Sequence, residues 1–277
     1  MRNKGSGRSG RSDAGRGEGR DATRSESRIG GRSSKPDLVN VHLWGIHAVE
    51  AALRNPTRKI KRLRLTENAR QRLGPAIEAR GVQPEVVNAR DFDRDPGADV
   101  VHQGAVLDTE VLPELDPRDF TPGAARDDLV LVLDQITDPH NVGAILRSAA
   151  AFGARGLVMT ARNSPPLEGT LAKAASGGLE LVPVAVVTNL ARALEQLGEI
   201  GYFRIGLDGQ GEGLLEAQKI AGPTVLVLGA EDTGMRRLTR ENCDVTCRIS
   251  TFGGLASLNV SNAAAVAMHT VVMGRKA

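Results

Sequence analysis

Three short blocks in the C-terminal half of the sequence hold the side chains whose types and spacing could support chemistry. They are residues 138–147, 228–235 and 257–262, and each follows a run of residues typical of a β-strand. Gly, Asn, Glu, Ser and one Arg recur in these blocks among small and apolar residues. Because ligands of α/β proteins bind where strands end and helices begin, the blocks indicate a polar binding site. Together they favour an active site.

The first block contributes Asn141 and Arg147. Asn141 stands where the N-cap of a helix is expected, and Val142, Ile145 and Leu146 begin an apolar stripe along that helix. Arg147 lies away from the stripe. Taken alone, this block therefore favours a structural interpretation, with a capping Asn and a solvated Arg.

The second and third blocks are less easily explained by structure alone. Gly229 ends an apolar strand, where a missing side chain would let a ligand approach the backbone, and Glu231 places a carboxylate nearby. A helix-initiating turn is the alternative for this block. In the third block Ser257 is a natural N-cap, but Asn259 is a poor residue for the first turn of a helix that is already capped. Asn259 is thus a candidate functional side chain.

The elements that must position these blocks alternate between strand and helix over residues 127–277. The expected strands cover residues 129–135, 156–159, 181–187, 203–207, 224–229 and 245–249. The expected helices cover residues 141–153, 169–176, 189–198 and 258–273. Apolar, β-branched strands in this order predict an α/β fold with a mostly parallel sheet covered on both faces.

A smaller α/β domain is predicted over residues 41–115. Its elements are a helix that ends near Asn55, a strand over residues 60–65, a helix that ends at Gly81 and further strands near 85–87 and 104–107. The densest basic cluster outside the N-terminal tail lies here, either as a solvated face or as a recognition surface: Arg58, Lys59, Lys61, Arg62 and Arg64. Residues 116–126 form a linker by their Pro and Gly content.

Residues 1–40 are rich in Gly, Ser and Arg and are predicted to be disordered, because they hold almost no large apolar residue. Residues 1–36 carry ten basic and four acidic side chains, whereas the whole chain has a net charge of only +3. The basic character therefore belongs to the tail. An electrostatic tether to phosphate backbones and a solubilising extension are both open interpretations. An organelle transit peptide is disfavoured by the Gly content and the acidic residues.

Composition argues against several other classes of protein. Aromatic residues make up 3% of the 277 residues, which disfavours RNA readers that stack bases on aromatic platforms. The sequence contains no run of apolar residues long enough to predict a membrane-spanning helix. Cys243 and Cys247 are too few for a disulfide framework or a zinc site, so no metal is expected. Two reduced thiols fit a cytoplasmic protein.

In order and spacing, the three blocks resemble the motifs of the SpoU/TrmH-type RNA ribose 2′-O-methyltransferases of the SPOUT superfamily. The resemblance covers residues 127–277. The segment that runs from residues 43–50 to residues 102–104 also resembles the L30e-like RNA substrate-binding domain that some members carry. This two-domain form is most similar to the branch that methylates guanosine in 23S rRNA.

The resemblance implies an S-adenosylmethionine-dependent enzyme that works as a homodimer and whose C-terminal domain forms a trefoil knot. It assigns the cofactor to the backbone of Gly229, Ile249 and Leu258. It assigns catalysis to a polar set made up of Asn141, Arg147, Glu231, Ser257 and Asn259. Methyl transfer to a ribose hydroxyl needs positioning and activation of a poor nucleophile. Arg147 would anchor the adjacent phosphate and assist proton removal, in its own subunit or across the dimer.

One stretch departs from the family pattern. Where the family usually has Pro-Met after the isoleucine of the third motif, this sequence has Ser250, Thr251 and Phe252, and we expect the cofactor loop to differ in shape.

The expected substrate is structured RNA, namely 23S rRNA, with tRNA as the nearest alternative. A non-catalytic RNA-binding or ribosome-assembly factor that kept the fold is a rival of another class, which the intact polar set disfavours. A nucleotide-binding oxidoreductase is a remote third interpretation.

Overall fold

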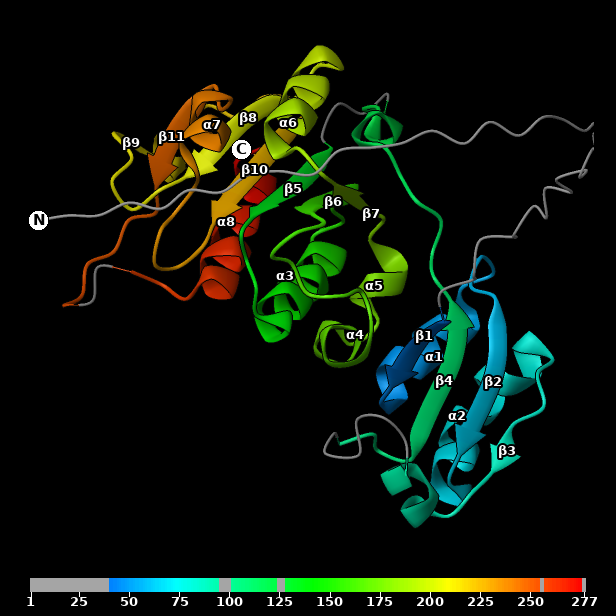
Figure 1. The fold of residues 1–277 in the computed structure, drawn as a ribbon. Coiled ribbons are helices and arrows are strands. Elements are labelled where there is room, and N and C mark those ends of the chain that lie inside the picture. Colours follow the sequence, from blue (N-terminus) through cyan, green and yellow to red (C-terminus); the bar gives the residue numbers. More distant parts are fainter. Residues whose placement is uncertain (1–39, 95–100, 124–127, 255–256, 276–277) are drawn as a thin grey trace, which may run out of the picture. The chain divides into compact units, whose positions relative to one another are not determined.

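The computed structural model describes residues 40–94, 101–123, 128–254 and 257–275 (Figure 1). Residues Leu38–Ala277 form one compact unit by their contacts, and this unit contains two separate β-sheets. The predicted disorder of residues 1–40 concerns residues outside the described part, except for Asn40, which begins the first strand. None of the helices in the described ranges is long and apolar enough to cross a membrane.

The first sheet has four strands in the order β1-β4-β2-β3. Its elements along the chain are β1 (Asn40–Trp44), α1 (Ile46–Arg54), β2 (Ile60–Leu65), α2 (Glu67–Arg80), β3 (Glu85–Val86), the 3-10 helix η1 (Ala89–Arg94) and β4 (Ala105–Glu110). β4 pairs antiparallel with β1 and β2, and β2 pairs parallel with β3. Leu43 and Leu63 both face Leu107 across these pairings and are buried with it, which makes one core for this sheet.

The second sheet has seven strands in the order β7-β6-β5-β10-β8-β11-β9, and every pairing that the structure shows in it is parallel. Its strands are β5 (Leu129–Asp134), β6 (Gly156–Thr160), β7 (Val184–Val187), β8 (Phe203–Leu207), β9 (Gly213–Leu214), β10 (Thr224–Gly229) and β11 (Val245–Arg248). The predicted α/β class and mostly parallel sheet are confirmed.

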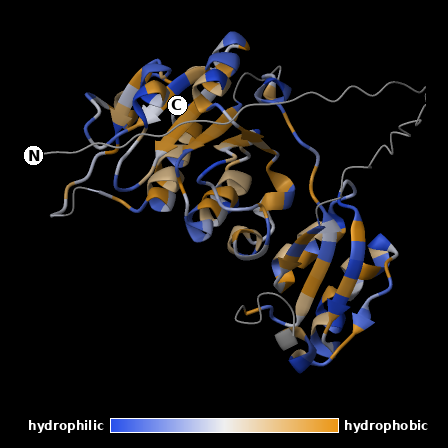
Figure 2. Ribbon diagram, in the orientation of Figure 1, coloured by the Kyte–Doolittle hydropathy of each residue, from blue (hydrophilic) through white to orange (hydrophobic). Residues whose placement is uncertain are grey.

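Helices connect these strands and cover both faces of the second sheet. They are the 3-10 helix η2 (Pro117–Phe120), α3 (Pro139–Ala151), α4 (Gly169–Ala175), α5 (Gly178–Leu181), α6 (Leu190–Glu199), the 3-10 helix η3 (Leu215–Ala217), α7 (Arg237–Glu241) and α8 (Val260–Gly274). Figure 1 shows α3, α4 and α8 on one side of the sheet and α6 on the other. Figure 2 shows the central strands as mainly hydrophobic, as burial on both faces requires.

The alternation of side chains along β5 explains this layering. Leu131 and Leu133 belong to the same core as Ile145 of α3, whereas Val130 and Val132 belong to a second core. α6 contributes Leu190, Ala193, Leu194 and Leu197 to that second core. Successive residues of a strand point to opposite faces, so a continuous apolar run serves two helical layers at once.

The structure differs from the sequence predictions mainly at short elements. The strand predicted over residues 181–187 is divided: α5 occupies its start, and β7 begins only at Val184. The positive φ of Gly177 (97°) starts this helical turn, and a hydrogen bond from Val182 N to Gly178 O (2.9 Å) closes it. β1, β9 and α7 were not predicted, because two to five residues carry little periodic pattern. The predicted linker includes η2, whose Phe120 is buried.

Candidate active site

Strand pairing brings the ends of β5 and β10 to the same edge of the second sheet. Asp134, the last residue of β5, lies opposite Gly229, the last residue of β10. α3 follows β5, the loop with Glu231 follows β10, and α8 packs against α3. The first and second blocks therefore leave the sheet side by side, and the third block joins them through α8.

Three of the predicted polar residues form one hydrogen-bonded cluster. Glu231 Oε1 accepts hydrogen bonds from Asn259 Nδ2 (2.7 Å), Asn141 Nδ2 (3.3 Å) and the backbone nitrogen of Val260 (3.1 Å). Asn259 Nδ2 also donates to Asn141 Oδ1 (3.0 Å). We call Asn141, Glu231 and Asn259 the amide–carboxylate cluster. One residue comes from each block, so the structure joins segments that are far apart in sequence.

Helix caps differ from the sequence prediction and explain why the cluster can form. Asp138 is the N-cap of α3 and accepts a hydrogen bond from His140 N (2.9 Å), with Pro139 in the first turn. Asn141 is therefore not the cap, and its side chain is available to Glu231. At α8 the N-cap is Asn259 and not Ser257, because Asn259 Oδ1 accepts from Ser261 N (2.9 Å) and Ser261 Oγ (2.6 Å).

Arg147 and Ser257 lie outside this cluster. Both side chains are exposed, and within the described residues neither makes a hydrogen bond or ion pair. Arg147 follows Asn141 along α3 by a rotation of about 240°, so the two side chains leave the helix on different sides. The guanidinium of Arg147 is thus open to a ligand or to another chain.

The chain's own backbone determines where Glu231 lies. A Cβ at Gly229 would lie 2.2 Å from the carbonyl carbon of Gly234, so only glycine permits this close approach. Gly234 has φ of 66°, forms a bridge with Ala230 and donates from its nitrogen to Ala230 O (2.8 Å). The loop from Gly229 to Gly234 therefore folds back on itself and presents Glu231 at its turn.

Asp134 and Arg236 hold the far side of this loop, and sequence reasoning missed both. Asp134 is fully buried, and its carboxylate accepts from Arg236 N (2.9 Å) and Arg236 Nε (2.7 Å). The signal in the sequence was an acidic residue that ends an otherwise apolar strand. A buried carboxylate requires such hydrogen-bonded pairing.

The loop of the third block is anchored at its start by Glu216 of η3, a third residue that sequence reasoning missed. Ser250 donates to this carboxylate from its nitrogen (3.0 Å) and from its hydroxyl (3.4 Å). Serine at position 250 thus supplies two donors where a proline would supply none. Phe252 is 97% exposed. Ile249, at the start of the loop, is partly buried against the main core, and Leu258 at its end is 42% exposed.

The basic cluster of the first sheet is largely paired with carboxylates. Arg62 forms an ion pair with Glu85 (2.6 Å), and Lys59 forms one with Glu110 (3.2 Å). Arg58 is buried. Much of the local positive charge is therefore balanced within the sheet, which the linear sequence did not reveal. In the part of the chain that the structure describes, no group of His, Cys, Asp or Glu side chains could hold a metal ion.

The chain is similar to known proteins over most of its length. The model of the SpoU rRNA Methylase family matches residues 128–269, and a model for RNA 2′-O ribose methyltransferase substrate binding matches residues 42–114. The 23S rRNA (guanosine-2′-O-)-methyltransferase RlmB of Pseudomonas syringae pv. tomato is 38% identical over 245 residues, which cover 85% of this chain and 96% of that protein. RlmB of Ralstonia nicotianae is 41% identical over 238 residues, 84% of this chain and 95% of that protein.

A solved structure shares the fold. The SpoU methyltransferase AviRb from Streptomyces viridochromogenes, in complex with AdoMet, aligns with a TM-score of 0.73 at 23% identity. The alignment covers 86% of this chain and 91% of AviRb. The likeness therefore extends over both sheets.

Proposed function

Because the chain belongs to the SpoU rRNA methylase family, we propose that it transfers a methyl group from S-adenosylmethionine to the 2′-hydroxyl of a guanosine in 23S rRNA. The observation that carries the proposal is the amide–carboxylate cluster, in which Asn141, Glu231 and Asn259 meet at the carboxyl edge of a parallel sheet. The names of the relatives support the choice of 23S rRNA and guanosine.

In the proposed reaction a ribose oxygen would attack a methyl carbon: an O–C bond forms as the C–S bond breaks, the sulfur leaves as a neutral thioether, and the hydroxyl proton passes to solvent water. When bound, S-adenosylmethionine supplies the electrophilic methyl group on its sulfonium sulfur. Arg147 anchors the phosphate beside the ribose, which its exposed guanidinium suits. Within the cluster, Asn141 and Asn259 hold Glu231 next to the ribose by hydrogen bonds. Correct placement of the hydroxyl is the main contribution of the protein, because the in-line geometry is strict.

The cofactor residues assigned by resemblance suit an adenosine. Gly229 ends β10, Ile249 directly follows β11, and Leu258 precedes α8, so all three lie at the ends of elements of the second sheet. None is charged, and Ile249 and Leu258 offer apolar side chains of which Leu258 is 42% exposed. Backbone groups and apolar side chains of this kind bind an adenine ring and a ribose without a counter-ion.

A homodimer with a knotted C-terminal domain is the proposed working form. Val266 and Met273 of α8 are 41% and 45% exposed and lie seven positions apart, on one side of the helix. A second copy of the chain would cover this apolar side. Arg147, whose side chain diverges from Asn141, would then serve the cluster of the partner.

Substrate binding is proposed for the four-stranded sheet, with support from the family model that matches residues 42–114. The domain limits of residues 41–115, 116–126 and 127–277 remain a prediction. A tether role for residues 1–40 would add non-specific affinity for the same RNA. Bacterial rRNA is made and modified in the cytoplasm, which is where the protein would work.

Methyl transfer to transcripts tests this proposal. We expect the purified full chain to transfer tritiated methyl groups from S-adenosylmethionine to unmodified 23S rRNA, and ribose-methylation mapping to locate the label on one guanosine. Labelling of tRNA but not 23S rRNA would contradict the substrate and favour the tRNA alternative. Calorimetric binding of S-adenosylmethionine without transfer to any RNA would contradict the enzyme and favour a non-catalytic RNA-binding factor.

A further inference from the structure

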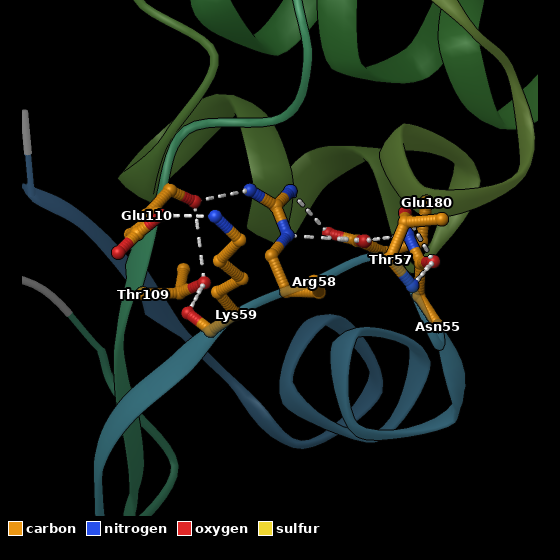
Figure 3. Close-up of polar contacts among 7 residues, drawn as sticks. All are labelled: Asn55, Thr57, Arg58, Lys59, Thr109, Glu110 and Glu180. Atoms are coloured by element: carbon orange, nitrogen blue, oxygen red, sulfur yellow. Dashed lines mark hydrogen bonds and ion pairs between the residues drawn. The ribbon is translucent and has the colours of Figure 1, made fainter. Parts of the chain in front are cut away.

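A buried ion pair joins the four-stranded sheet to helix α5 (Figure 3). Arg58 precedes β2, Glu180 lies in α5, and their side chains are only 1% and 4% exposed. Arg58 Nη2 donates to Glu180 Oε1 (2.6 Å), and Arg58 Nε donates to Glu180 Oε2 (3.2 Å). Two parallel hydrogen bonds between planar groups fix orientation as well as distance.

The other polar atoms around this pair are also bonded. Arg58 Nη1 donates to Glu110 O (3.1 Å), and Asn55 Nδ2 donates to Glu180 Oε2 (2.7 Å). Arg80 donates to the carbonyl oxygen of Arg58. Glu180 is thus the one acidic group of α5 that accepts from the first sheet, and it does so through three donors. A buried charge that loses its partner is strongly unfavourable, so this contact favours a single placement of the sheet against α5.

α5 also contacts helix α3 at Arg147. A Cβ at Gly178 would lie 2.7 Å from Leu146 O and 3.0 Å from Arg147 N, so the α5 backbone lies directly on α3. A Cβ at the preceding residue, Gly177, would lie 3.0 Å from the Cβ of Ala51 in α1. Gly178, which contacts the backbone of Arg147, is therefore only two residues from Glu180, which binds Arg58.

We propose that Arg58 and Glu180 are positioning residues, which hold the RNA-binding sheet at a fixed distance from Arg147 so that bound RNA presents its ribose correctly. The inference rests on the proposed methyl transfer and adds a role for residues that touch neither cofactor nor ribose. The pair acts through α5 and α3. Neither residue carries a sequence signal, since Arg58 is one of several clustered basic residues and Glu180 is an isolated acid.

The test is the Glu180→Gln variant, which keeps the size of the side chain but leaves Arg58 without its counter-ion. We expect kcat at saturating 23S rRNA to fall by roughly ten- to hundredfold, because small misplacements of a reacting group have effects of this size. The Kd for S-adenosylmethionine, measured by calorimetry, should remain within about twofold of wild type, and the binding stoichiometry should be that of wild type. The KM for RNA should change less than kcat. A general loss of folded protein would instead lower the stoichiometry.

Glu241→Gln is the matched control, since Glu241 forms an exposed ion pair with Arg237 in α7 (2.6 Å). We expect it to keep wild-type kcat. A folded Glu180→Gln variant with wild-type kcat overturns the proposal. If Glu180→Gln does not fold, Asn55→Ala decides, because it removes one donor to Glu180 and leaves the ion pair: a smaller fall in kcat supports the proposal and an unchanged kcat overturns it.

Hydrogen exchange separates this inference from the proposed function. If the wild-type protein methylates no RNA, the proposed function fails. The role of the Arg58–Glu180 ion pair is then tested by hydrogen exchange, without any activity measurement. Glu180→Gln should then lose amide protection in α1 and α5 while β10 stays protected. Unchanged protection in α1 and α5 would show that the ion pair does not hold the sheet.

Discussion

The side-chain amide of Asn259 has no hydrogen-bonding capacity left for a substrate. Its Nδ2 group donates to Glu231 Oε1 and Asn141 Oδ1, and its Oδ1 accepts twice from Ser261. It therefore acts as an organiser of the cluster. Glu231 differs, because in the described part of the chain its Oε2 accepts no hydrogen bond. Glu231 Oε2 is the oxygen of the cluster that can accept from a ribose hydroxyl or from an incoming guanidinium.

Arg147→Ala is the substitution that tests the proposed phosphate anchor. We expect methyl transfer to be abolished while S-adenosylmethionine still binds, because Arg147 is exposed and is not one of the residues assigned to the cofactor. Arg192→Ala, at an exposed arginine of α6, is the matched control and should leave transfer unchanged. The checks are tritium transfer to 23S rRNA and calorimetric titration of the cofactor. Full activity of Arg147→Ala would contradict the assignment.

At the scale of elements, the loop after β10 is the part whose backbone is most constrained. Gly229 makes room for Gly234, and Asp134 holds Arg236 through two hydrogen bonds. Glu231 lies between these two anchors. A short loop that is fixed at both ends loses little entropy when it positions its carboxylate, which favours a preorganised site.

Gly229→Ala should disturb this loop and lower both stability and activity. The added Cβ would lie 2.2 Å from Gly234, so the backbone must move and Glu231 must move with it. We expect a loss of about 1–3 kcal/mol in the free energy of unfolding, as for other overpacked sites. Gly209→Ala is the control, because a Cβ there meets nothing within 4 Å. Chemical denaturation and the transfer assay measure the two effects. Wild-type values for Gly229→Ala would show that the loop is not closely packed.

The sequence predicted the long elements well and the contacts between them poorly. The strands β8 and β10 lie at their predicted positions, and the pattern is clearest in β10, where alternating Val and Leu residues end at Gly229. The caps were misassigned at α3 and α8, where two candidate capping residues stand close together. Pairings such as Asp134 with Arg236 and Arg58 with Glu180 join residues far apart in sequence, so no local pattern indicates them.

At the scale of the whole chain, Asn141 of the amide–carboxylate cluster and Arg147 lie in the same helix but point to different sides of it. Asn141 and Arg147 are both in α3, and only Asn141 reaches Glu231. A single copy of the chain thus brings part of the predicted polar set together and leaves its arginine outside. A dimer in which α3 or α8 meets a second copy would bring the partner's Arg147 to the cluster.

Subunit mixing tests whether Arg147 acts across the proposed dimer. Arg147→Ala and Glu231→Ala should each be inactive alone, because each lacks one member of the site. In a mixed dimer that works across the interface, one of the two sites combines an intact Glu231 with an intact Arg147 from the other copy. Equal mixing after subunit exchange should therefore restore about one quarter of wild-type transfer, since half of the dimers are mixed and each has one complete site. If Arg147 serves its own subunit, both sites of the mixed dimer are defective and mixing restores no activity. Sedimentation of the mixture, with one variant labelled, would confirm that exchange took place.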